Sequence, residues 1–283
     1  MTRNRSTLTA GTARRRSQPN VVGHVLLLAL TILSIFPVYW MIVTSIRPTN
    51  ELLTSSLVPT TLTWEHYRYM WNAIPMDSML WTTFVMSVAI TLTQLLTSLL
   101  AAYAFARWSF PGGRIVFGMF ALTWLVPFQV TMIPNYVLLS NLGWLDTLWA
   151  LVVPQTASAF AILLLYQSVN AFPRDLLDAA RIDGANSWST LWRVLVPNLR
   201  AQLATLAILL FISSWNEYFW PLLVTRDIER SVVQIGLQMF LTSEGNLWGP
   251  LMAGATVASL PILVLYVVLQ RQVVDSFMKS GLR

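Results

Sequence analysis

The chain has 283 residues, of which 55% are hydrophobic and only 11% are charged, with a mean hydropathy of +0.60. Because soluble domains carry about 25% charged residues, this composition excludes an ordinary soluble protein. The absence of cysteine excludes disulfides, thiolate catalysis and cysteine-ligated metals. The net charge of +6 fits basic loops beside a membrane, so nucleic acid is not an expected partner.

Six apolar stretches are long enough to cross a bilayer. A spanning helix needs about 20 apolar residues, and in lipid the backbone must satisfy its own hydrogen bonds, so helices are the default. The predicted spans are residues 22–46, 79–104, 115–134, 150–170, 203–224 and 250–270. The sequence therefore predicts an all-α integral membrane protein with six transmembrane helices.

Basic residues gather on one side of these spans. Fourteen of the 18 Lys and Arg residues lie in the N-terminal tail, in the loops after the second and fourth spans, and in the C-terminal tail. Since positively charged loops stay in the cytoplasm, we expect both termini there and a multi-pass protein of the cytoplasmic (inner) membrane. The first apolar run is too long for a signal-peptide core, so we expect it to remain as an anchor.

The predicted organisation has four parts. Residues 1–20 are polar and rich in Arg and Ser, which is typical of a disordered cytoplasmic tail. Residues 21–78 hold the first span and an outer loop. Residues 79–270 are expected to form a core of five spans, which includes a long inner loop at 171–200, and residues 271–283 a cytoplasmic tail.

The inner loop at residues 171–200 contains a compact acidic segment rich in small residues. Pro173 suits the first turn of a helix, Asp178 is favourable near its N-terminus, and Gly184 can adopt the left-handed conformation that ends it. Ser187 could then cap a second short helix. We expect a helix–turn–helix outside the bilayer, either as a docking surface for another protein or as a solvated connector.

Two motifs resemble one known family, the permease subunits of binding-protein-dependent (type I) ABC importers. Their cytoplasmic signature, E-A-A-x-x-D-G-A followed by a hydrophobic stretch and proline, reads here Asp178-Ala179-Ala180-Arg181-Ile182-Asp183-Gly184-Ala185 with Pro197 downstream. Their fifth span in the carbohydrate branch resembles Ser214-Trp215-Asn216-Glu217-Tyr218-Phe219-Trp220-Pro221-Leu222. Over about residues 75–283 the chain is similar to the second permease of maltose-type importers. It departs from the pattern at Asp178, where Glu is usual, and at Ala201, where a second proline is common.

The resemblance implies a function and a set of partners. It implies alternating-access import of a carbohydrate, together with a second homologous permease, two ATP-binding subunits and an extracytoplasmic substrate-binding protein. In this family the inner loop forms coupling helices that sit in a cleft of the ATPase. The implied ATPase-coupling residues are Asp178, Ala179, Ala180, Asp183, Gly184 and Ala185.

The chain lacks the usual means of hydrolysing ATP. A P-loop requires a lysine directly after a glycine, whereas the one lysine here is Lys279, which follows a methionine. His24 and His66 are far apart, and no metal-ligand spacing or Ser–His arrangement is visible. We therefore expect a non-catalytic subunit that binds no cofactor or metal, with ATP and Mg bound by a partner ATPase.

Glu217 is the one charged residue in the predicted fifth span. A charge at bilayer depth is costly and is usually paired or functional. Three roles are open: a structural or gating role, contact with substrate, and proton transfer. With Gln129, Trp215, Asn216 and Tyr218 it is a candidate for the translocation pathway near the outer gate. Proton transfer would instead make the chain a proton-coupled secondary carrier that transports alone.

Overall fold

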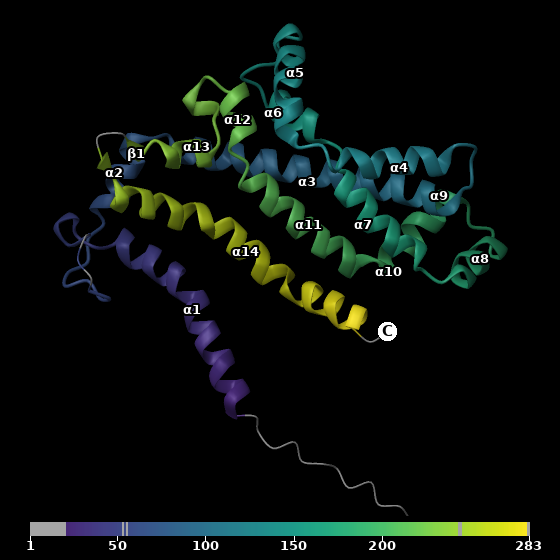
Figure 1. Cartoon of the computed structure of the whole chain (residues 1–283), viewed down its shortest axis with the longest axis horizontal. Helices are drawn as coiled ribbons and strands as arrows, with labels where there is room; N and C mark the ends of the chain where they lie inside the picture. The colour runs from purple at the N-terminus through teal and green to yellow at the C-terminus, as the bar shows by residue number, and fades with distance from the viewer. Residues whose placement is uncertain (1–20, 53, 55, 243–244, 282–283) are drawn as a thin grey trace, which may run out of the picture.

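The computed structural model describes residues 21–52, 54, 56–242 and 245–281, with side chains up to residue 272. The predicted disordered tail at residues 1–20 lies outside these residues. Helices make up most of the described chain; α3, α11 and α14 run roughly alongside one another, whereas α5 projects away from the bundle and α1 diverges from it towards residue 21 (Figure 1).

The elements follow one another along the chain. They are α1 (Val21–Ser45), η1 (Thr49–Glu51), α2 (Glu65–Ala73), α3 (Met76–Arg107), α4 (Gly113–Thr123), α5 (Phe128–Asn141), α6 (Leu148–Val152), η2 (Val153–Gln155), α7 (Ala159–Asn170), α8 (Arg174–Ile182), α9 (Ser187–Ser189), η3 (Thr190–Leu195), α10 (Val196–Asn198), α11 (Arg200–Trp215), α12 (Phe219–Val224), η4 (Ile228–Arg230), α13 (Val233–Gln238), β1 (Leu241–Thr242), β2 (Gly245–Asn246) and α14 (Trp248–Gly281). The two short strands pair antiparallel, with Leu241 opposite Asn246.

Three helices, α1, α3 and α14, are long and apolar enough to cross a membrane. Three bent pairs bring the number to the predicted six if each pair is one span: α4 with α5 at 96°, α6 with α7 at 46°, and residues 187–198 with α11 at 80°. The last pair begins inside the predicted inner loop and ends at Trp215, so it does not coincide with the fifth span predicted at residues 203–224.

The third span differs from the straight helix predicted at residues 115–134. α4 ends at Thr123, α5 begins at Phe128, and the two helices meet at 96°. Pro127 precedes α5, and a proline disfavours the helical conformation of the residue before it while lacking an N–H of its own. With 11 residues, α4 is about 16 Å long, roughly half the thickness of the hydrocarbon core.

The helix α3 lies at the centre of the bundle and packs most extensively against α7 and α11. Near its inner end, Leu99, Ala102 and Tyr103 form one core with apolar side chains of α7, η3 and α11. Nearer its start, Met86 and Ile90 pack against α5, α6 and α12. The inner loop is thus part of the same hydrophobic core as the spans.

Asp146 joins two outer connections. It follows α5 with a positive φ of 59°, and its carboxylate accepts hydrogen bonds from the backbone N–H groups of Arg226 and Asp227. These donors hold the pKa of Asp146 below its ordinary value. The bonds stabilise the fold at neutral pH, and this stabilisation is lost only as the pH falls through the lowered pKa.

Hydrogen bonds of Arg47 and His66 stabilise the first connection after α1, which is the predicted first outer loop. The buried Arg47 guanidinium donates to the carbonyls of Thr54 at 3.3 Å and Ser56 at 2.6 Å. His66 Nε2 lies 2.8 Å from the Arg47 carbonyl oxygen, and because a carbonyl only accepts, Nε2 carries the proton. The His66 ring also packs directly against Gly249 at the start of α14.

Gly249→Ala is expected to destabilise the protein. An added Cβ would overlap the buried His66 ring, and overpacking of this kind costs about 1–3 kcal/mol. We expect a lower thermal unfolding midpoint for the detergent-purified protein. The control is Gly118→Ala in α4, where an added Cβ meets no atom within 4 Å; an equal loss in both variants would contradict the packing argument.

Candidate functional site

The acidic segment forms the helix α8 and ends as predicted at Gly184. Gly184 has a φ of +81°, its N–H donates to the carbonyl of Arg181, and the Ala185 N–H donates to the carbonyl of Ala180. This pair of bonds defines a Schellman motif, which favours glycine at the left-handed position. The turn therefore depends on the residue type that the sequence provides.

The second half of the loop begins one residue earlier than predicted. Asn186, not Ser187, is the helix cap, and its side-chain oxygen accepts from the backbone N–H of Ser189 at 2.8 Å. Asn and Ser cap helices about equally well, so residue type alone did not distinguish them. Residues Thr190–Leu195 then wind as a π-helix before α10 and α11.

The six predicted coupling residues lie together on this helix–turn–helix. Asp178, Ala179, Asp183 and Gly184 are exposed, and Ala180 and Ala185 are half-buried. Large apolar side chains are exposed beside them: Ile182 is 87% exposed, and Leu176 and Trp188 are also exposed. A solvated connector would place polar side chains here, whereas an exposed apolar patch of this kind is typical of a protein interface.

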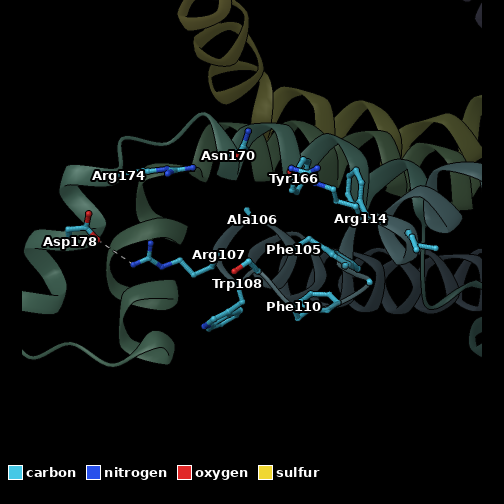
Figure 2. A pocket seen from close by; sticks show the side chains of 15 residues that line it. Phe105, Ala106, Arg107, Trp108, Phe110, Arg114, Tyr166, Asn170, Arg174 and Asp178 are labelled. Carbon is cyan, nitrogen blue, oxygen red and sulfur yellow. Dashed lines mark ion pairs between the residues drawn. The ribbon is translucent and has the colours of Figure 1, made fainter.

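Asp178 also contacts the spans of its own chain. Its Oδ1 lies 3.6 Å from Arg107 Nη2 at the end of α3 and 3.7 Å from Arg181 Nη1 (Figure 2). In the sequence, Arg107 counts only as one of the cytoplasmic charges, because no motif links it to Asp178, which lies some 70 positions later. The ion pair ties α8 to the central helix.

The buried side chain of Leu177 attaches α8 to the rest of the helical core. Its side chain is 5% exposed and lines a small cavity with Tyr103, Val169 and Phe172. Tyr103 adds a hydrogen bond of 3.1 Å from its hydroxyl to the carbonyl of Ser187. The loop is thus held by burial and a hydrogen bond on one face while its other face stays exposed.

Leu177→Ala is expected to loosen the inner loop. Removing a buried leucine side chain costs at least about 2 kcal/mol, which would speed amide exchange in residues 174–198 by roughly 30-fold. The measurement is hydrogen–deuterium exchange on the membrane-embedded protein. The matched control is Leu176→Ala, whose side chain is 49% exposed; equal exchange in the two variants would refute the anchoring role.

The pathway candidates fall around a break in the fifth span. α11 ends at Trp215 and α12 begins at Phe219, so Asn216, Glu217 and Tyr218 form the break. Asn216 is exposed, whereas Glu217 and Tyr218 are half-buried. Gln129 lies exposed on α5, beside a Phe128 ring that packs edge-on against the Trp220 ring.

The tryptophans on either side of this break each form a hydrogen bond to a neighbouring helix. Trp215 is buried and donates from Nε1 to the carbonyl of Ala258 in α14 at 3.1 Å. Trp220 is buried and donates from Nε1 to the carbonyl of Ala150 in α6 at 2.9 Å. Trp215 is therefore buried between helices, whereas the next residue, Asn216, is exposed.

Glu217 has a structural partner. Its Oε1 accepts the backbone N–H of Trp220 at 3.2 Å, one of the N–H groups that have no partner within the first turn of α12. The arrangement around Glu217 is that of a helix cap.

Among the described residues, no group of three or more His, Cys, Asp or Glu could hold a metal ion.

Two substitutions of Glu217 distinguish the contribution of the helix cap to stability from that of the negative charge. Glu217→Ala removes the acceptor and should cost about 1 kcal/mol, whereas Glu217→Gln keeps an oxygen that can accept the same bond. We expect the first variant alone to lower the thermal unfolding midpoint of the purified protein. An equal loss in Glu217→Gln would show that the negative charge, not the cap, matters.

Comparisons with known proteins agree with one another. A family model described as "Binding-protein-dependent transport system inner membrane component" matches residues 94–279. The chain is 29% identical over 269 residues to the lactose transport system permease protein LacG of Rhizobium radiobacter, covering 95% of this chain and 98% of that protein. It is 31% identical over 271 residues to the sn-glycerol-3-phosphate transport system permease protein UgpE of Yersinia enterocolitica, covering 92% and 96%.

A solved structure shares the fold. It is that of a bacterial ABC transporter involved in the import of the acidic polysaccharide alginate. The TM-score is 0.78 at 24% sequence identity, and the match covers 89% of this chain and 95% of that chain. The chain therefore shares its fold with one chain of that transporter.

Proposed function

The chain belongs to the family of binding-protein-dependent transport system inner membrane components, and we propose that it is the permease subunit of an ATP-driven carbohydrate importer. The observation that carries the proposal is the exposed apolar face of the inner loop, where Ile182 is 87% exposed. The loop's other face is fixed to α3 by Leu177 and Asp178. Such a loop suits a rigid contact with a second protein.

The proposed energy source is a separate ATPase. Two ATP-binding subunits, which bind ATP and Mg, would each dock on an inner loop: one on this chain and one on a second homologous permease. In this chain the contact would use Asp178, Ala179, Ala180, Asp183, Gly184 and Ala185. Movement of α8 would pass through Leu177 and the Arg107–Asp178 pair to α3, and from α3 to α7 and α11. An extracytoplasmic binding protein would deliver substrate from the other side.

The proposed topology places residues 171–200 and both termini in the cytoplasm. Support comes from the basic residues, 14 of 18 of which lie on that side of the spans. The permease core would span residues 79–270, with residues 21–78 added as the first span and outer loop. Asp146 and Arg47 would then brace the outer, binding-protein side.

Carbohydrate is proposed as the substrate class. LacG is named for lactose and UgpE for sn-glycerol-3-phosphate. The exposed Asn216 and Gln129 offer neutral donors and acceptors that match hydroxyl groups. Glu217 and Tyr218 would shape the pathway between them, and Trp215 would support it through its contact with α14.

The rival is a proton-coupled secondary carrier that uses Glu217. It predicts uptake by this chain alone, driven by a proton gradient. The hydrogen bond from the Trp220 N–H to Glu217 favours the structural role instead, because it gives the carboxylate a partner within its own span.

Gly184→Trp is expected to uncouple the transporter while membrane insertion stays intact. A side chain forced into the left-handed conformation costs about 1–2 kcal/mol, and the bulk would block the docking face, so co-purified ATPase should fall about tenfold or more. The measurement is ATPase recovery and ATP-driven sugar uptake in proteoliposomes that contain all subunits.

The control for this variant is Gly143→Trp, at a second exposed glycine with a positive φ of 69° and no atom within 4 Å of an added Cβ. It lies at the opposite end of the spans and should leave ATPase recovery unchanged. Wild-type uptake by Gly184→Trp would count decisively against the coupling role. Uptake by the chain alone under a proton gradient would establish the rival function.

A further inference from the structure

A second hollow lies beside the inner loop, between the ends of α3 and α7 and the starts of α4 and α8. Its volume is about 820 Å³, and Arg107, Arg114, Arg174, Tyr166 and Asn170 line it. Figure 2 shows these side chains on opposite walls, with Arg174, Asn170 and Arg114 along one side and Arg107 along the other. The proposed substrate pathway does not use this space, and of the six proposed coupling residues only Asp178 lines it.

The hollow has an excess of positive charge. Its lining includes three arginines from three different elements and one carboxylate, Asp178. That carboxylate is shared, because Arg181 also pairs with it. Arg107 Nη2 lies 3.6 Å from Asp178, which is too far for a hydrogen bond. This nitrogen has no hydrogen-bond acceptor among the described residues, so Asp178 neutralises the Arg107 guanidinium only in part.

The N-terminus of α4 adds a positive electrostatic potential, which is favourable to an anion in the hollow. α4 is 11 residues long, has no acidic residue in its first turn and no side-chain cap at its N-terminus. Its first residues, Gly113 and Arg114, line the hollow. Helix N-termini attract anions through the helix dipole, and this field acts here even though the N–H groups of Gly113 and Ile115 already donate to the carbonyls of Phe110 and Gly112. The arginines and the helix end therefore favour the same kind of ligand.

The mouth of the hollow continues into an apolar surface. Ile115, which lines the hollow, is 70% exposed, and Met119 and Leu122 are exposed further along α4. Their spacing of four and then three residues places them on one face of the helix. Trp108 and Phe110 are exposed beside the mouth. A lipid with its headgroup in the hollow would place its acyl chains along this stripe.

We propose that this hollow binds the phosphate headgroup of an anionic phospholipid of the inner leaflet, between Arg107, Arg114 and Arg174. Basic pockets between spans on the cytoplasmic side are a known type of site for anionic lipid headgroups. The assignment rests on the proposed orientation of the spans, and it is independent of the transported substrate. The headgroup contacts both α3, through Arg107, and the first turn of α8, through Arg174, so the lipid braces the coupling helix.

The test uses the intact transporter with all its subunits, purified in neutral detergent. It is titrated with phosphatidylglycerol or with phosphatidylcholine, and bound lipid is counted by native mass spectrometry. Arg114→Gln and Arg174→Gln should each weaken phosphatidylglycerol binding about fivefold, the equivalent of about 1 kcal/mol per arginine. Phosphatidylcholine binding should not change, and Arg114→Lys should retain most of the affinity for phosphatidylglycerol.

The control is Arg271→Gln, which removes an exposed charge from the same end of the spans outside the hollow. Thermal unfolding midpoints confirm that each variant is folded, and either pocket variant alone suffices for the comparison. Equal phosphatidylglycerol binding by the pocket variants and Arg271→Gln would overturn the proposal. So would displacement of the lipid by inorganic phosphate at equal concentration, which would assign the hollow to a soluble phosphate. A wild-type complex that binds no phosphatidylglycerol in the titration would likewise overturn the proposal.

Discussion

The length of α3 is the constraint on which the rest of the molecule depends. Its 32 residues make a helix of about 48 Å, well beyond the roughly 30 Å of the hydrocarbon core. Its C-terminal end supplies Tyr103 and Arg107 as supports for the loop at residues 171–200, and in the proposed orientation this end reaches past the lipid on the cytoplasmic side. Its middle packs against α7 and α11, so any displacement of the loop acts directly on three spans.

The sequence predicts features that follow from composition or from a single residue's conformation. Long uncharged windows predict the six spans, and Gly184 predicts the end of α8, because few other residues adopt a left-handed φ. The bend before Pro127 escaped prediction, since the apolar run continues through it without a polar signal. Hydropathy alone does not show whether a span is a straight helix or a bent one.

The candidate site was predicted only in part, for a related reason. The signature motif locates Asp178, but its partner Arg107 is distant in sequence, and positive-inside counting treats all basic residues alike. From residue type alone, Trp215 is a pathway candidate. The buried N–H groups of Trp215 and Trp220 donate to carbonyls of α14 and α6, which adds a packing role that the sequence does not show, and the pathway role of Trp215 stays a prediction. Such choices depend on tertiary contacts, which residue type does not encode.

The fifth span combines two rigid attachments with one break. Trp215 fixes the end of α11 to α14, and Trp220 fixes α12 to α6. Since backbone freed at bilayer depth must find partners, Glu217 supplies an acceptor for α12 at the break. Each half of the span is thus attached to a different neighbour. Relative motion of α14 and α6 would concentrate at Asn216–Tyr218, which places the polar groups of the proposed pathway where the two halves of the span can move apart.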